Sequence, residues 1–272
     1  MSIEPEVFAD PRDLGGRAAR MIADGLVAAR EAGRPYVLGC PGGRSASSTY
    51  VALAGLVRTE RLAVDHLVVV MMDDYLVPGS DGTLVHELAG APHSCIRFGR
   101  EEIVRPLDEA AGPGRGVRAD HLWFPDPADP TAYDGRIRDV GGIDLFLLAS
   151  GSSDGHVAFN PAGAERDSRT RVLELPDSTR RDNLATFPSF GGELARVPRH
   201  GVTVGIDTIA AGSASVAMLV HGREKGRAAA HLLAADAYDP AWPATVFAEC
   251  AQPHLFLDSD ALAAATALVP AR

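Results

Sequence analysis

The strongest constraint on the fold is a series of short, almost wholly apolar segments that alternate with longer segments of helical periodicity. The clearest apolar runs are Tyr36–Cys40, His66–Met72, Ile143–Ala149 and Ser215–Val220. Elsewhere apolar residues recur at helical spacing, for example in Pro11–Ala32 and in Lys225–Ala235. Strands that are apolar at consecutive positions are buried on both faces, as in a parallel sheet covered by helices. The sequence therefore predicts an α/β protein with a mostly parallel sheet and helices on both faces.

The composition agrees with one packed globule. Of the 272 residues, 46% are hydrophobic and 23% are charged, which is typical of ordinary globular chains. A core of this size needs no disulfide or metal to hold it together. No repeat, low-complexity tract or long linker divides the sequence, so we expect residues 1–272 to form a single domain.

Charge and cysteine content limit the partners and the location of the protein. The formal net charge is −10, whereas a nucleic-acid-binding protein should carry a basic face, so we expect no nucleic-acid partner. No apolar run approaches the roughly 20 residues that cross a bilayer, and we expect no membrane partner. The segment MSIEPEVFAD lacks the pattern of a signal peptide. With three cysteines at unrelated spacings, these features predict a cytoplasmic location.

Ligands of parallel α/β sheets bind at the carboxyl ends of the strands, so the residues that follow each apolar run form the candidate site. After the first run the chain reads Gly42-Gly43-Arg44-Ser45 and then enters a helix. Glycines let the backbone approach an anion closely, and the N–H groups and positive end of the helix attract it. Arg44 adds a guanidinium fork and Ser45 a hydroxyl donor. This segment predicts an anion site, although it matches neither common phosphate-binding fingerprint.

Two further strand ends carry acid–base groups. Asp73 and Asp74 follow the second run, and on an extended chain only one of the two carboxylates can face the ligand crevice, as a candidate general base. After the third run, Asp154 and His156 are close enough for the carboxylate to orient the imidazole if the loop turns. No third ligand lies at a recognisable spacing, so we expect no metal.

The fourth strand end contains the only lysine of the chain. Of 26 basic residues, 25 are arginine and one is Lys225, which begins a helix after the run that ends at Val220. A bias towards arginine replaces lysine wherever the two are interchangeable, so the one that remains is a candidate for a site that requires a compact ammonium. We expect its side chain to reach the same crevice as the glycine-rich segment.

Several segments occur in an order that resembles one enzyme family. They are Leu38–Gly43, Met72–Tyr75, Ile143–Phe146 with Asp154–Asn160, Ser168–Arg171, Thr203–Gly205 and Val220–Lys225. Together they cover most of the chain and resemble glucosamine-6-phosphate deaminase, with 6-phosphogluconolactonase a more distant relative on the same fold. Several matching segments in the correct order are far more specific than any single motif.

The resemblance implies a fold, a substrate class and a division of roles. It implies a Rossmann-like three-layer sandwich and a small anionic sugar, such as a sugar phosphate, as substrate. Asp73 would move a proton between C1 and C2 of the open sugar, while His156, oriented by Asp154, would open the ring. The segment Gly42–Ser45 and Lys225 would hold the phosphate. Such proton transfer needs one base and one acid of matched pKa and no cofactor. The number of subunits, a homo-oligomer included, stays open.

The chain departs from the family pattern at two places. The family has a glutamate that completes the relay of the histidine, and Pro161 stands at its place here, with Glu165 a few residues further on. The phosphate-binding arginine of the family corresponds to Arg180 or Arg181, or is replaced by Arg44. These departures leave open which sugar is bound and whether its amine is released.

Three other functions are compatible with parts of the sequence. A lactonase would use His156 to activate water on an ester carbonyl. A serine hydrolase would use the GxSxG pattern of Gly151–Gly155 with an acid and a histidine such as Asp236 and His254, although the residues after Gly155 are a poor start for the helix it requires. A non-enzymatic sugar-phosphate sensor would keep Lys225 and would not need a base.

Overall fold

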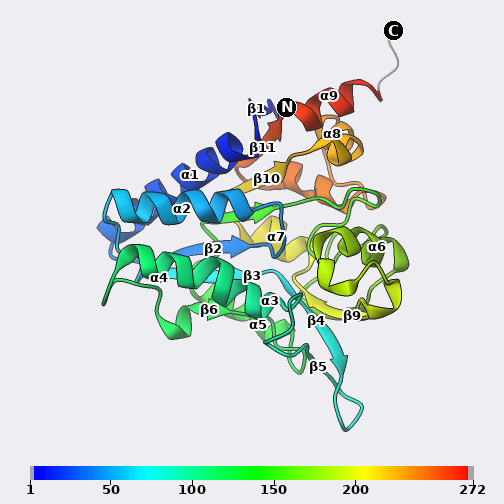
Figure 1. The fold of residues 1–272 in the computed structure, drawn as a ribbon, viewed down its shortest axis with the longest axis horizontal. Helices are drawn as coiled ribbons and strands as arrows, with labels where there is room; N and C mark the ends of the chain where they lie inside the picture. Colours follow the sequence, from blue (N-terminus) through cyan, green and yellow to red (C-terminus); the bar gives the residue numbers. More distant parts are fainter. Residues whose placement is uncertain (1–2, 269–272) are drawn as a thin grey trace.

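The structure, a computed structural model that describes residues 3–268, is built around a seven-stranded sheet whose paired strands all run parallel (Figure 1). In spatial order its strands are β1 (Glu6–Phe8), β11 (Pro253–Asp258), β10 (Val216–Val220), β7 (Leu145–Leu148), β2 (Tyr36–Cys40), β3 (Leu67–Met71) and β6 (Leu122–Trp123). The four predicted apolar runs form four adjacent strands at its centre. Their carboxyl ends therefore lie side by side.

Alternate residues of each central strand pack against different helical layers. In β3, Leu67 and Val69 belong to one apolar core, and Val68 and Val70 belong to the other. One layer consists of α1 (Pro11–Glu31), α2 (Ser47–Thr59), α3 (Cys95–Phe98), the π-helical segment η1 (Gly99–Val104) and α4 (Arg105–Ala111). The other consists of α5 (Thr131–Asp139), α7 (Ile206–Gly212), α8 (Gly226–Leu233), the 3₁₀ segment η6 (Pro243–Glu249) and α9 (Ser259–Thr266). In Figure 1, α1, α2 and α4 lie side by side across the sheet. The predicted α/β class, with helices on both faces, is confirmed.

A second, antiparallel sheet was not predicted. Its strands are β5 (Leu84–His86), β4 (Asp73–Pro78), β9 (His200–Thr203) and β8 (Arg171–Glu174), in that order. The chain leaves the parallel sheet after Met71 and enters the second sheet at Asp73. The strand β9 lies between β4 and β8 and pairs antiparallel with both. Both β8 and the hairpin of β4 and β5 are partly exposed and rich in polar residues, which is why they lack an apolar strand pattern.

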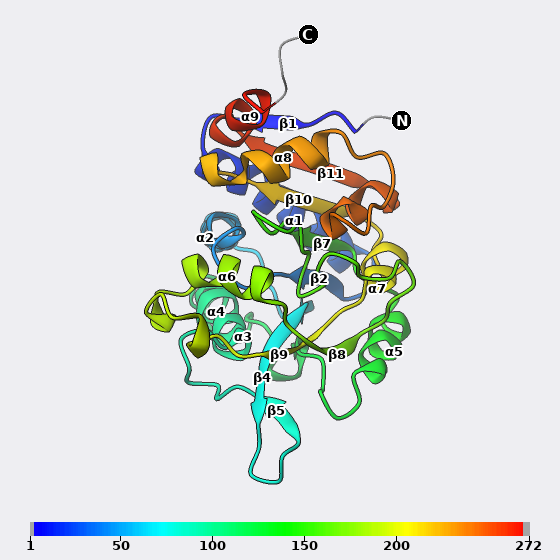
Figure 2. The same ribbon diagram turned by 90° about the vertical axis from the view of Figure 1, so that its right-hand side faces the viewer.

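The second sheet has its own small core. The helix α6 (Asp177–Thr186), the 3₁₀ turns η3 (Pro188–Phe190) and η4 (Leu194–Arg196), and the loops between them pack against it. The core consists of Tyr75, Phe159, Leu175, Phe190 and Val197. Figure 2 shows α6 beside this sheet and the hairpin of β4 and β5 projecting from the body of the molecule. The second sheet and the segments packed on it lie next to the carboxyl end of β3.

Element boundaries agree best where helical or apolar periodicity is strong. The expected helix Pro11–Ala32 is α1 to within one residue, and the expected strand Tyr36–Cys40 is β2. The helical segment Cys95–Ala111 was missed, because Gly99 and Pro106 interrupt its pattern. The remaining short turns are η2 (Ala119–His121) and η5 (Arg223–Lys225). Within residues 3–268, no helix has both the length and the apolar character that a membrane crossing requires.

The packing at the centre of the sheet predicts a strong effect of one added methyl group. A Cβ on Gly39 in β2 would lie 2.1 Å from Cδ2 of Phe146, which is fully buried on the neighbouring strand β7. We expect Gly39→Ala to lower the free energy of unfolding by about 1–3 kcal/mol, the usual cost of overpacking. The matched control is Gly55→Ala at an exposed position of α2, where the new Cβ meets nothing within 4 Å. It should raise the free energy of unfolding by about 0.5–1 kcal/mol. Chemical denaturation measures the free energy of unfolding of both variants. A Gly39→Ala protein as stable as wild type would contradict this packing.

Candidate active site

One pocket collects the polar residues at the ends of the four central strands. It has a volume of about 620 Å³, including its open mouth. Its wall contains Gly42, Gly43, Arg44 and Ser45 after β2, Asp73 after β3, His156 after β7 and Lys225 after β10. Asp154 lies directly behind His156 and does not line the pocket. The structure thus places every predicted site residue at one location, seven in the wall of the pocket and one behind it.

The glycine-rich segment and the lysine form a cationic end of the pocket. The loop is held from below by the hydroxyl of Tyr50, which donates to the carbonyl of Pro41 at 2.9 Å. Arg44 is exposed at the mouth, and Lys225 is partly buried and donates to the carbonyl of Ser150. Burial lowers the pKa of Lys225 from its usual value. One of the three ammonium N–H groups is engaged, so the others are available to an anion.

Asp73 is a buried carboxyl group at the first residue of β4. Its residue is 7% exposed, and its Oδ1 accepts a hydrogen bond from the thiol of Cys95 at 3.4 Å. Burial raises the pKa of Asp73 to about 7, because the charged form loses its hydration. The nearby Asp74 acts in the same direction, while the Cys95 thiol and His156 oppose it. A carboxyl group with this pKa is divided between its two protonation states near neutral pH.

The carboxylate of the adjacent Asp74 is used in hydrogen bonds within the protein. Its Oδ1 accepts hydrogen bonds from the backbone N–H groups of Tyr75 and Cys95, at 2.9 and 2.8 Å, and its Oδ2 pairs with Nδ1 of His86 at 2.9 Å. It is fully buried and does not line the pocket. The prediction that only one of the two carboxylates faces the crevice agrees with this arrangement.

His156 is oriented by a hydrogen-bonded chain. Its Nδ1 lies 2.6 Å from Oδ1 of Asp154, whose Oδ2 accepts from the hydroxyl of Thr179 at 2.7 Å. Burial acts to raise the pKa of Asp154, but the hydrogen bonds from His156 and Thr179 and the electrostatic interaction with His156 outweigh it and hold this pKa well below its usual range. The carbonyl of His156 also accepts from the N–H of Gly151 at 2.7 Å. A Cβ on Gly151 would lie 2.3 Å from Nδ1 of His156, so only glycine fits beside the pair.

Sequence and structure comparisons identify relatives of the chain. It is 33% identical over 247 residues to a glucosamine-6-phosphate deaminase of Beutenbergia cavernae, covering 91% of this chain and 87% of that protein. It is 30% identical over 258 residues to a glucosamine-6-phosphate isomerase of Candida albicans, covering 94% and 96%. The chain belongs to the glucosamine-6-phosphate deaminase family. The resemblance inferred from the sequence segments is therefore confirmed. No family model matches the chain.

Solved structures show the same fold. A monomeric glucosamine-6-phosphate deaminase superposes with a TM-score of 0.81 at 24% identity, over 96% of this chain and 100% of that one. A 6-phosphogluconolactonase of Thermotoga maritima superposes with a TM-score of 0.65 at 17% identity, over 93% and 98%. The Rossmann-like fold expected of the glucosamine-6-phosphate deaminase family is confirmed.

The departures from the family pattern have clear structural consequences. Glu165 is exposed and does not line the pocket, so it does not take the place that Pro161 leaves without a carboxylate. Arg180 is buried and points away, with its guanidinium bonded to Asp177 and to the carbonyls of Leu194 and Val197. Arg181 is exposed outside the pocket. Of the three arginines considered from the sequence, only Arg44 lines the pocket.

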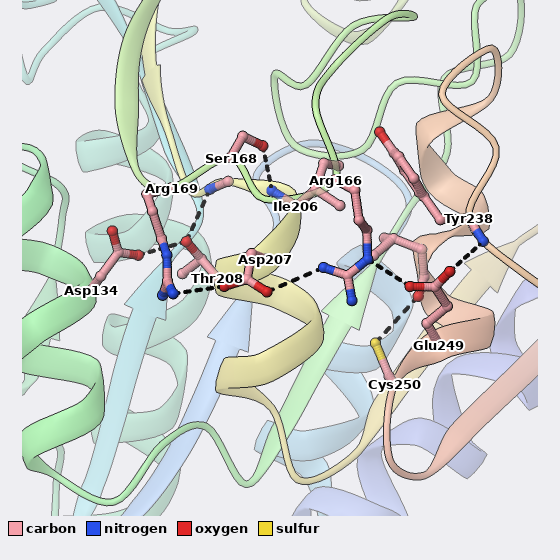
Figure 3. A network of polar contacts seen from close by, with 12 residues as sticks. Asp134, Arg166, Ser168, Arg169, Ile206, Asp207, Thr208, Tyr238, Glu249 and Cys250 are labelled. Carbon is pink, nitrogen blue, oxygen red and sulfur yellow. Dashed lines mark hydrogen bonds and ion pairs between the residues drawn. The ribbon is translucent and has the colours of Figure 1, made fainter.

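The segment Ser168–Arg171 braces the site from behind instead of entering it. Figure 3 shows Arg166 and Arg169 on either side of Asp207, with Arg166 continuing to Glu249 and Asp134 bonded to Thr208. Farther along the segment, Nη1 of Arg171 donates to Oδ1 of the buried Asn160 at 2.8 Å. The Nδ2 of Asn160 donates in turn to the carbonyls of Val157 and Val204. This network fixes the chain that follows His156 against α7 and the end of β9.

One residue of that chain has an unusual backbone. Ala158, in the wall of the pocket, has a φ of +50°, which side-chain-bearing residues seldom adopt. The conformation is enforced by the bonds around Asn160 and by the N–H of Phe159, which donates to the hydroxyl of Thr203 at 3.1 Å. Such strain occurs preferentially where function requires a fixed geometry.

The serine-hydrolase alternative does not fit the structure. The GxSxG segment Gly151–Gly155 lies in a loop, and no helix follows it. The hydroxyl of Ser153 donates to Asp182 at 2.8 Å and not to a histidine. The predicted partner His254 lies on β11, away from the pocket. The required strand–nucleophile–helix turn is absent from the part of the chain that the structure describes.

Asp182 also completes a cluster that the sequence spacing did not reveal. One ligand atom from each of Asp154, His156 and Asp182 lies within 4.8 Å of the others. The carboxylates already accept hydrogen bonds from Thr179, from the His156 ring and from Ser153. The arrangement is accounted for by these contacts, and no metal is needed to explain it.

Several wall residues were not predicted from the sequence. They are Cys95 from α3, Tyr75 from β4, Phe159 from the loop after β7, and Asn183, Thr186 and Phe187 from α6 and its end. Tyr75 is 1% exposed, and its hydroxyl has no hydrogen-bond partner among the described residues. Tyr75 and Phe159 belong to the segments Met72–Tyr75 and Asp154–Asn160, which resemble the family. The residues of α3 and α6 follow no periodic pattern that could have marked them as wall residues.

The raised pKa of Asp73 predicts that this residue destabilises the folded protein at neutral pH. Between the ordinary Asp value and about 7, the folded state retains a proton that the unfolded state has lost, so stability falls as the pH rises through this window. We expect Asp73→Asn to raise the free energy of unfolding at pH 8 by about 2–4 kcal/mol more than at pH 4. Denaturant titrations at both pH values test this, with the exposed Asp139→Asn as the control. A pH-independent difference would contradict the assignment.

Proposed function

We propose that the chain is an aldose–ketose isomerase of the glucosamine-6-phosphate deaminase type, acting on a sugar phosphate or a similar anionic sugar, with or without release of an amine. Membership of the family supports the enzyme class. The observation that carries the proposal is the shared pocket: the buried carboxyl of Asp73 and the oriented imidazole of His156 line the same cavity as Arg44 and Lys225.

The pocket has one end that would bind the anionic group of the substrate and another that would carry out the proton transfers. The N–H groups of the glycine-rich loop, the Arg44 guanidinium and the Lys225 ammonium attract a phosphate or other anion. Asp73 has the pKa expected of a base that works near neutral pH, and it would carry the proton between C1 and C2 of the open sugar. His156, oriented through Asp154 and Thr179, would transfer a proton at the ring oxygen.

Isotope exchange distinguishes this function from its alternatives. Sugar phosphates are incubated with the protein in D₂O and followed by NMR. Deuterium entering C1 or C2 supports the isomerase, and ammonia formed in addition supports the deaminase. Acid production without exchange would support a lactonase that uses His156 to activate water. Binding without any conversion would support a sensor.

Asp73→Asn separates the base from the binding site. The change removes the proton acceptor and keeps the shape of the side chain, so we expect turnover to fall by about 10²–10⁴-fold, the usual contribution of a positioned base. Binding of the sugar phosphate, measured by calorimetry, should persist because the anion-binding end is unchanged. Turnover that survives the substitution would remove Asp73 from the mechanism.

Lys225→Ala tests the anion-binding end. Loss of a charge-assisted hydrogen bond should raise KM for a phosphorylated substrate by about 10–100-fold. The matched control is Arg181→Ala, because this arginine is exposed and lies outside the pocket. Steady-state kinetics on both variants gives the comparison. An unchanged KM for Lys225→Ala, or an equal rise in both variants, would exclude the role of Lys225.

A further inference from the structure

The carboxylate of Asp73 has one side-chain neighbour that the proposed mechanism does not use. Within residues 3–268, the thiol of Cys95 is the only hydrogen-bond donor recorded to this carboxylate, with Sγ at 3.4 Å from Oδ1. Both residues line the pocket, and Cys95 is 3% exposed. The Oδ2 of Asp73 has no hydrogen-bond partner among residues 3–268, which leaves it available to a substrate.

The thiol is held firmly in this place. The backbone N–H of Cys95 donates to Oδ1 of Asp74 at 2.8 Å, and Cys95 is the first residue of α3, capped by the hydroxyl of Ser94. A Cβ on Gly42 would lie 3.4 Å from Sγ, so the thiol also packs against the anion loop. Asp74 thus fixes the backbone of Cys95, and Cys95 in turn contacts Asp73.

We propose that Cys95 is a positioning residue that holds Oδ1 of Asp73 through its S–H group and sets the pH at which this carboxylate becomes available as the base. The role of Asp73 as the base rests on the proposed function. The coupling between the Cys95 thiol and the Asp73 carboxylate does not depend on it. An S–H donor stabilises the charged form of its acceptor and so opposes the effect of burial.

The surroundings of Asp73 allow the thiol to act as a donor. Burial and the charges of Asp73 and Asp74 raise the pKa of Cys95 well above its usual value, so the sulfur keeps its proton. The other titratable groups that face Asp73 or share its pocket come from β4, the hairpin, α5, and the loops after β2, β7 and β10. They are Asp74 with its partner His86, Tyr75, Tyr133, Arg44, His156 and Lys225.

The test is the pH profile of kcat/KM in the variants Cys95→Ala and Cys95→Ser. Without a donor, the acid limb of the Cys95→Ala profile should move upward by about half to one pH unit. A hydroxyl donates at least as well as a thiol, so the limb of Cys95→Ser should return to the wild-type position or below it. The control is Cys250→Ala, which removes a buried thiol whose one hydrogen bond within residues 3–268 goes to the carbonyl of Val246. Its profile should not move.

A readout that is independent of turnover keeps this inference separate from the proposed function. In protein labelled with ¹³C at the aspartate carboxyl carbons, the signal lost in Asp73→Asn identifies Asp73, and its titration is followed in wild type and Cys95→Ala. An upward shift in Cys95→Ala supports the inference, even if no sugar phosphate is converted, and in that case only the proposed function fails. The inference would be overturned if Asp73 titrates equally in wild type and Cys95→Ala. It would also be overturned if Cys95→Ala lowers activity at every pH without moving the acid limb of the kcat/KM profile.

Discussion

The burial of one carboxyl group, at the point where the chain leaves one sheet for another, is the constraint on which the rest of the site depends. Asp73 is separated from the end of β3 by a single residue and begins β4, so it is enclosed where the two sheets meet. Burial costs the charged form its hydration and raises the pKa of Asp73 to about 7, which is what the proposed proton transfer requires of a base near neutral pH. The second sheet therefore helps to enclose the residue that we propose as the base.

The order of strands explains why the remaining groups meet there. Because β10, β7, β2 and β3 are neighbours and parallel, the loops that follow them open onto one crevice, although they are far apart in the sequence. The cations Arg44 and Lys225 gather with the anion loop, while Asp73 and His156 supply the acid–base groups. His156 is hydrogen-bonded to Asp154, which also accepts from the hydroxyl of Thr179, and a carboxylate oxygen of Asp182 lies within 4.8 Å of both.

Sequence reasoning found the parts of the molecule in which local pattern and tertiary environment agree. The four central strands were visible because both of their faces are buried, and strand ends led directly to Asp73, His156 and Lys225. The second sheet and the helical segment Cys95–Ala111 were not found. Their residues are partly exposed, or interrupted by glycine and proline, so tertiary packing decides their structure. Cys95 counted only as one of three cysteines at unrelated spacings, because its contact with Asp73 joins two segments that share no sequence pattern.

The most direct test of the account is a crystal structure with an open-chain hexitol 6-phosphate, which has the shape of the opened sugar and no carbonyl to react. The account predicts that the phosphate lies against the anion loop, Arg44 and Lys225, and that a free oxygen of the Asp73 carboxylate lies beside C1 and C2. A ligand bound in the reverse direction, or one that leaves Asp73 in contact only with protein atoms, would contradict it.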